Sequence, residues 1–147
     1  MQASNVALLL NRNARRVNER SLARIGEWVP EQQVYATRSE EESVEAVRDI
    51  LSKGYGNVFA GGGDGTFVGL VNTLADERPE GPWPRLGVLR LGTGNALAQL
   101  VSSGSPEDDL QAFLAHEPKD DLPLSLIRDD RGVPFPLGGL GWAARIL

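Results

Sequence analysis

The chain has 147 residues, with 15 Lys and Arg against 20 Asp and Glu, one His and no Cys. This length suits one domain, and the absence of Cys excludes disulfide frameworks, thiolate zinc sites and cysteine nucleophiles. A net charge of −5 argues against a nucleic-acid-binding protein. No apolar run approaches the ~20 residues that span a bilayer. We therefore expect a globular, cytoplasmic protein that does not bind nucleic acid.

Four short apolar runs are typical of buried strands, at residues 6–10, 33–37, 57–60 and 86–91. Each is followed by apolar positions at helical spacing, which predicts helices over residues 17–29, 39–54, 67–75 and 95–101, with a fifth starting at Ser105. Ser39 and Glu42 form a capping-box pattern, and Gly54 suits a C-cap. This alternation predicts an α/β fold with an open, mainly parallel sheet flanked by helices.

The pattern changes near the end of the chain. Apolar residues alternate over 122–126 and again over 133–137, on either side of a DDRG turn at 129–132, which is typical of a hairpin. The last residues are apolar and stand in mid-pattern. We expect residues 1–118 to form one α/β domain and residues 119–147 to begin a truncated, β-rich second domain. Its exposed strands are predicted to favour a homodimer.

The segment Gly61-Gly62-Gly63-Asp64-Gly65-Thr66 stands between a buried strand and an amphipathic helix. Glycines let the backbone approach a ligand closely, and several N–H groups can converge on an anion at the positive end of the helix. The pattern fits neither G-x-x-x-x-G-K-[ST] nor G-x-G-x-x-G. We interpret it as a phosphate-binding loop. The alternative is a tight turn with Asp64 or Thr66 as the N-cap.

Asp64 needs its own explanation, because a carboxylate among phosphate-binding amides repels phosphate unless something mediates. It can hold Mg²⁺, accept a proton from a substrate hydroxyl, or order the loop. The sequence alone leaves these three roles open.

A second glycine turn, Gly92-Thr93-Gly94-Asn95, also follows an apolar strand and precedes a helix. Parallel strands would present both turns at the same carboxyl edge, where α/β proteins bind ligands. The two turns together therefore predict a ligand site more strongly than either does alone.

Two stretches resemble a known family. GGGDGTFVGLVNTL at residues 61–74 and LGVLRLGTGNALAQ at residues 86–99 look like the catalytic domain of diacylglycerol kinases and their relatives, the sphingosine, ceramide and bacterial YegS-type lipid kinases. The opening LLLNRNARRVN at residues 8–18 is similar to the family's first strand and loop. Gly-Gly-Asp-Gly-Thr alone is shared with NAD kinases, whereas the later Gly-Thr-Gly-Asn is more specific.

The resemblance implies a nucleotide-binding domain with ATP at the sheet edge and Mg²⁺ bridging its phosphates. Asp64 becomes the candidate catalytic base, as in sphingosine kinases, whereas bacterial relatives usually take this acid from their second domain. No metal ligand is assigned. The arginines at positions 12, 15 and 16 can neutralise phosphate charge, the alternative being a solvated cluster. The implied nucleotide contacts are Asn11, Thr37, Gly61, Gly62, Gly63, Asp64, Gly65, Thr66, Gly92, Thr93 and Asn95.

The implied reaction is transfer of the ATP γ-phosphoryl group to a lipid hydroxyl. The lipid would bind through the second domain, so this chain alone is expected to be inactive and to contact membranes only peripherally. One alternative is an NAD kinase-like small-molecule kinase, against which residues 95–98 (NALA) argue. Another is a non-catalytic nucleotide-binding or regulatory domain. Arg12 and Arg90 replace prolines usual in the family, and the lipid remains unidentified.

Overall fold

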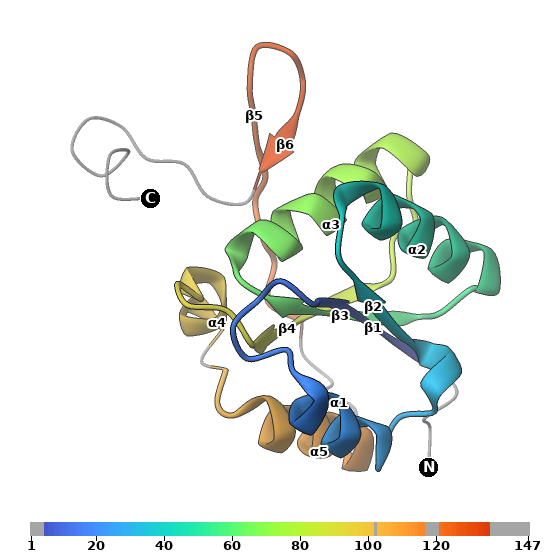
Figure 1. Ribbon diagram of the computed structural model, residues 1–147. Helices are drawn as coiled ribbons and strands as arrows, with labels where there is room; N and C mark the ends of the chain where they lie inside the picture. Colours follow the sequence, from blue (N-terminus) through green and yellow to red (C-terminus); the bar gives the residue numbers. More distant parts are fainter. Residues whose placement is uncertain (1–4, 102, 117–120, 136–147) are drawn as a thin grey trace.

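Four parallel strands form the central sheet of the molecule (Figure 1). The computed structural model describes residues 5–101, 103–116 and 121–135. Every neighbouring pair of strands in this sheet runs parallel. The expected α/β fold is therefore confirmed. In sheet order the strands are Val34–Thr37 (β2), Val6–Asn11 (β1), Asn57–Gly62 (β3) and Arg85–Arg90 (β4).

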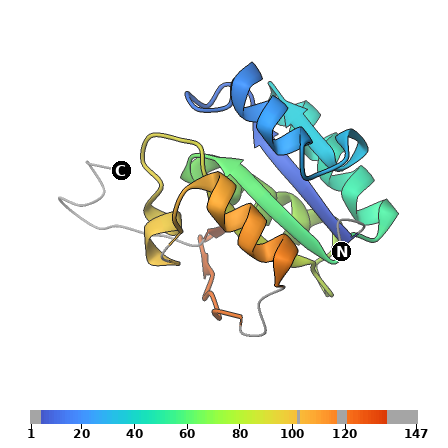
Figure 2. The ribbon, with the colours of Figure 1, turned by 90° about the horizontal axis from the view of Figure 1, so that it is seen from below.

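Helices cover both faces of this sheet. α2 and α3 lie on one face and α1 and α5 on the other, as Figures 1 and 2 show from two directions. None of the helices in the described ranges is long and apolar enough to cross a membrane. The helices span Glu19–Gly26 (α1), Glu40–Lys53 (α2), Asp64–Glu77 (α3), Ala96–Leu100 (α4) and Pro106–Ala115 (α5), with a 3-10 turn at Glu31–Gln33.

Strand β1 lies at the centre of the core, and its residues 6–10 are 0% exposed. Ala7 and Leu9 pack into the cluster that includes residues of α2 and α3. Leu8 and Leu10 point the other way, into the cluster that includes residues of α1 and α5. A strand covered on both faces needs a continuous apolar run, which is why the VALLL pattern identified it correctly.

Side-chain caps set the starts of α1 and α2. Ser39 Oγ accepts a hydrogen bond from Glu42 N at 3.1 Å, as predicted. The Glu42 carboxylate, however, accepts from Arg38 N at 2.7 Å, so the second half of the expected capping box is wrong. Between Asn18 and Ser21 there is a complete capping box that the sequence reading missed. This box starts α1 later than expected.

A short antiparallel hairpin follows the α/β domain. Its strands are Ile127–Arg128 (β5) and Pro134–Phe135 (β6), with the predicted turn at residues 129–132 between them. A hairpin forms around the predicted turn, but residues 122–126, expected as its first strand, form no strand. Leu122, Leu124 and Leu126 instead line a groove of the α/β domain. The expected domain boundary at residue 118 and the rest of the expected second domain, residues 136–147, lie outside the described residues.

Candidate functional site at the carboxyl edge of the sheet

The four parallel strands end side by side, and their carboxyl ends define the candidate site. Asn11 at the end of β1 pairs in register with Thr37 at the end of β2, and Gly62 of β3 pairs with Arg90 of β4. The chain leaves β1 towards β2 on one side and leaves β3 towards β4 on the other. Ligands of open α/β sheets bind in the crevice at such a switch point.

The first glycine turn is shorter than expected. β3 continues through Gly62 and α3 begins at Asp64, so Gly63 alone separates them. The predicted turn over residues 61–66 is therefore wrong in its bounds, because the ladder with β4 carries the strand two glycines further. The helix N-cap is Gly63, which has no side chain to cap with, so neither Asp64 nor Thr66 is the N-cap.

The glycines of this segment differ in how much space surrounds them. A Cβ on Gly61 would lie 2.3 Å from Leu10 Cδ2, and one on Gly62 would lie 2.3 Å from Thr66 Oγ1, so a larger residue at either position would require these buried side chains to shift. A Cβ on Gly63 or Gly65 would meet nothing within 4 Å. The fold does not require glycine at these two positions, and the open space in front of them is available to a ligand.

Backbone amides at the start of α3, those of Asp64 and Gly65, are free of acceptors among the described residues. Thr66 Oγ1 is buried and also lacks a hydrogen-bond partner within the described ranges. These donors lie at the positive end of a 14-residue helix, where the helix dipole favours an anion.

The second turn is closed by its own asparagine. Asn95 is 6% exposed, and its backbone is left-handed, with φ of 55°. Its Oδ1 accepts from Gly92 N at 3.2 Å and its Nδ2 donates to Gly92 O at 2.6 Å. Thr93 and Gly94 remain exposed at the tip of the turn. This network makes the second turn a compact unit that ends where α4 begins.

The two turns touch each other, and Asp64 joins them. A Cβ on Gly92 would lie 2.4 Å from Gly63 Cα, so the backbones are in close contact. Asp64 Oδ2 accepts from Ala96 N at 3.0 Å and Oδ1 accepts from Leu97 N at 2.9 Å. This geometry matches the loop-ordering role among the three considered for Asp64. The sequence reading did not predict the contact, because no local pattern marks it.

Asn11 and Thr37 anchor the loop between β1 and α1. Asn11 Oδ1 accepts from a backbone amide two residues on, at 2.9 Å, and Thr37 O accepts from Arg12 N at 2.8 Å. Arg16 N donates to Leu91 O at 3.2 Å and so ties the loop to the second turn. All the nucleotide-contact residues expected from the sequence therefore lie along one edge of the sheet.

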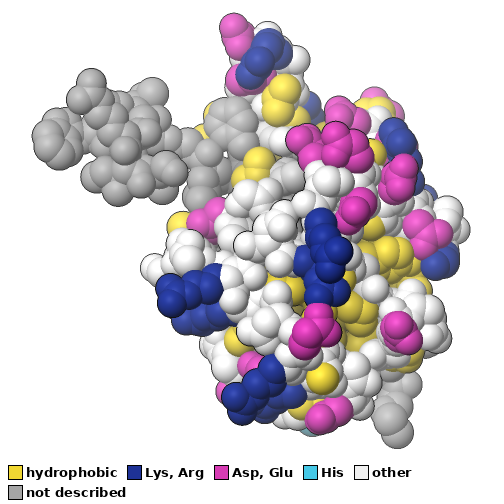
Figure 3. All heavy atoms as spheres, viewed as in Figure 1, with side chains coloured by type: hydrophobic (Ala, Val, Ile, Leu, Met, Phe, Trp, Pro, Cys, Tyr) yellow, Lys and Arg dark blue, Asp and Glu magenta, His cyan; other side chains and the backbone are white. Residues whose placement is uncertain are grey.

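The arginines near this loop differ in their pairing. Arg12 forms an ion pair with Glu19, and Arg24 of α1 lies 3.7 Å from Glu107. Arg15 and Arg16 are exposed and have no acidic partner within the described residues. Basic and acidic side chains are interspersed on the face shown in Figure 3. In the part of the chain that the structure describes, Arg15 and Arg16 are thus the cations of this loop without an acidic partner.

Carboxylates are sparse at this edge. Within residues 5–101, 103–116 and 121–135, no group of three or more His, Cys, Asp or Glu side chains could hold a metal ion. Mg²⁺ commonly binds through one or two carboxylates, water and substrate phosphates. A Mg²⁺ ion here would therefore be held chiefly by the phosphates of a bound ligand.

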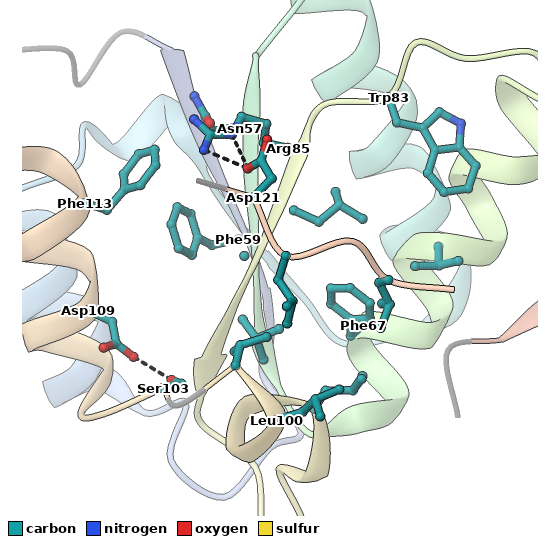
Figure 4. A pocket seen from close by; sticks show the side chains of 18 of the residues that line it. Asn57, Phe59, Phe67, Trp83, Arg85, Leu100, Ser103, Asp109, Phe113 and Asp121 are labelled. Carbon is teal, nitrogen blue, oxygen red and sulfur yellow. Dashed lines mark hydrogen bonds and ion pairs between the residues drawn. The ribbon is translucent and has the colours of Figure 1, made fainter. Parts of the chain in front are cut away.

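A separate groove follows the outer edge of β4 (Figure 4). Its volume is about 640 Å³, and its walls are mainly apolar, with Phe59, Phe67 and Phe113 among them. Arg85 and Asp121 form an ion pair at 2.7 Å at one end. Neither glycine turn contributes to its lining. The groove and the carboxyl edge are therefore distinct features.

Comparison with known proteins gives one family throughout. The family model described as diacylglycerol kinase catalytic domain matches residues 5–122. A probable lipid kinase YegS-like from Chromohalobacter salexigens is 32% identical over 105 residues, which are 68% of this chain and 32% of that protein. Diacylglycerol kinase iota from Mus musculus and from Homo sapiens are each 46% identical over 52 residues, 35% of this chain and 5% of theirs. The chain therefore corresponds to about a third or less of these relatives.

Proposed function

Since the chain belongs to the diacylglycerol kinase catalytic domain family, whose model covers residues 5–122, we propose that it forms the nucleotide-binding part of an ATP-dependent lipid kinase. The observation that carries this proposal is the pair of apposed glycine turns. The space in front of Gly63 and Gly65 is open, and the amides of Asp64 and Gly65 have no acceptor among the described residues. A phosphate chain is a ligand that fits such amides.

The proposed nucleotide contacts lie around this space. The amides of Asp64 and Gly65 would bind phosphate oxygens, and the exposed Thr93 would approach them from the second turn. Arg15 and Arg16 would contribute the positive charge that a P-loop lysine supplies elsewhere. Mg²⁺ would be held through the phosphates, with Asp64 as the nearest carboxylate of the turns. The catalytic role of Asp64 remains a prediction.

The proposed reaction is an in-line phosphoryl transfer. A lipid hydroxyl oxygen forms a bond to the γ-phosphorus of ATP, the bond from that phosphorus to the β–γ bridging oxygen breaks, and ADP leaves. The hydroxyl proton goes to a carboxylate base. Such transfers depend mainly on positioning and on neutralising charge. We propose that the lipid binds through sequence that corresponds to the unmatched part of the longer relatives, at the membrane surface.

Calorimetry with MgATP tests the nucleotide site. We expect the unaltered chain to bind, and Gly65→Ala to weaken binding about tenfold or more, because the new methyl group occupies the space left for phosphate. Gly69→Ala is the matched control, since it lies in the same helix and its Cβ would also meet nothing within 4 Å. No binding at millimolar ATP would contradict the proposal, as would equal effects of the two substitutions.

A transfer assay with γ-labelled ATP identifies the acceptor class when it uses a protein that also carries the sequence proposed to bind the lipid, since this chain alone is expected to be inactive. Diacylglycerol, sphingosine and NAD are offered separately, and label in either lipid supports the proposal. Label in NAD alone would instead support the small-molecule kinase alternative. ATP binding without transfer to any acceptor in that longer protein would favour a non-catalytic nucleotide-binding domain.

A further inference from the structure

Asp64 is the side chain that connects the two glycine turns. Its two oxygens accept from Ala96 N and Leu97 N at 3.0 and 2.9 Å. These are the first two amides of α4, whose own N-cap residue, Asn95, provides no side-chain cap. A carboxylate from α3 therefore takes the place of a capping residue for α4. Such charge-assisted bonds are stronger than neutral ones.

The second turn has few other anchors to the first. The side-chain hydrogen bonds of Asn95 close the turn upon itself and reach nothing outside it. Within the described residues, Asp64 makes the side-chain hydrogen bonds that cross between the turns. α4 has only five residues, and Leu100 and Val101 at its end are exposed. Leu97 and Ala98 are buried and pack α4 against the domain, while the Asp64 carboxylate sets where the helix starts.

We propose that Asp64 is a positioning residue, which holds the second turn and α4 against the first turn so that both can face one phosphate chain. This rests on the proposed function. The fit around the carboxylate is close, since a Cβ on Gly94 would lie 3.3 Å from Asp64 Oδ2. Both carboxylate oxygens are held by backbone amides of α4.

Three roles of Asp64 predict different nucleotide affinities. A positioning residue shapes the site for the nucleotide itself. Asp64→Asn should therefore weaken the binding of ATP and of MgATP by the same factor, about tenfold. If Asp64 were a metal ligand, Asp64→Asn would weaken the binding of MgATP and leave the binding of metal-free ATP unchanged. A general base acts on the acceptor hydroxyl, so its loss would leave both affinities unchanged. Calorimetry with and without Mg²⁺ therefore separates the roles, and either of the last two patterns would overturn the proposal.

Asp64→Glu and Asp109→Asn are the comparison variants. Glutamate keeps the charge but adds a methylene that the tight fit does not accommodate, so we expect it to behave like Asp64→Asn. Full affinity in Asp64→Glu would overturn the proposal. Asp109 also accepts from a backbone amide, Gly104 N, at 2.9 Å, but outside the turns. Asp109→Asn should leave both nucleotide affinities unchanged.

Amide hydrogen exchange gives a readout that does not require nucleotide. In Asp64→Asn, the amides of Ala96 and Leu97 should exchange about ten times faster or more, while amides in the middle of α2 keep their rates. Unchanged rates at these two amides would overturn the proposal. If the unaltered chain binds no ATP, the proposed function fails, and the exchange rates still decide whether Asp64 holds α4.

Discussion

Gly92→Ala tests whether the two glycine turns must touch. The new Cβ would lie 2.4 Å from Gly63 Cα, 2.5 Å from Gly63 N and 2.8 Å from Gly62 C. All three atoms belong to the backbone, so no side-chain rotation can relieve the overlap. The second turn must therefore move away from the first.

The size of this movement gives the expected loss of stability. Ordinary contact begins at 3.4 Å, so the backbones must separate by about 1 Å. That shift would stretch the hydrogen bonds of Asp64 to α4, now 2.9 and 3.0 Å, beyond good geometry. Overpacking costs about 1–3 kcal/mol, and a weakened charge-assisted bond adds about 1 kcal/mol. We expect the free energy of unfolding to fall by about 2–4 kcal/mol.

Urea denaturation and thermal melting measure the effect. A loss of this size lowers the melting temperature by roughly 6–15 °C for a domain of this length. Gly65→Ala is the matched control, because its Cβ meets nothing within 4 Å and its backbone is helical. It should leave stability unchanged or raise it slightly. Equal stability of Gly92→Ala and the unaltered chain would refute the close contact between the turns.

Substitutions at three further positions test local features. Asn95→Gly keeps the left-handed backbone but removes the hydrogen bonds to Gly92, so urea denaturation should show a loss of about 1–2 kcal/mol. Asn95→Ala should lose about 1 kcal/mol more, because alanine is strained at φ of 55°, and equal losses would contradict this. Ser105→Ala removes the acceptor for Asp108 N at the start of α5, so the unfolding free energy should fall by about 1 kcal/mol while Ser105→Thr loses less. Burial and a hydrogen bond to Asp49 raise the pKa of Tyr35 to about 12, from 10.0. Because the folded-state pKa lies above the unfolded one, this tyrosine stabilises the protein fully below about pH 10 and loses that contribution as the pH rises towards 12. Tyr35→Phe should remove this part of the alkaline destabilisation between pH 9 and pH 11.5 in urea titrations, and an unchanged alkaline loss would contradict the assignment.

Local patterns were sufficient for most of the secondary structure. The apolar run at residues 6–10 identified a doubly covered strand, because burial on both faces requires apolar side chains at every position. Gly54 was expected at a helix C-cap and has φ of 73° there. Ser105 caps α5 as its position before Pro106 indicated. These features depend on neighbouring residues, so the sequence carries them directly.

The bounds of the glycine segment could not be predicted from local pattern. Three consecutive glycines indicate a turn, yet Gly61 and Gly62 belong to β3 because they pair with residues of β4. The capping bond of Glu42 likewise went to Arg38 and not to Ser39. In both places, neighbouring backbone groups could serve almost equally well, and the three-dimensional geometry decided which one was used. The propensities of the residues do not determine that outcome.

The sequence by itself determined that this protein is an α/β domain with two glycine turns, because periodicity and turn chemistry act over a few residues. Only the tertiary structure decided how the turns relate to each other. The contact of Gly92 with Gly63 and the bonds of Asp64 to Ala96 and Leu97 join segments about thirty residues apart. Such contacts arise from strand register and from the packing of helices on the sheet. They convert two separate turns into one candidate phosphate site.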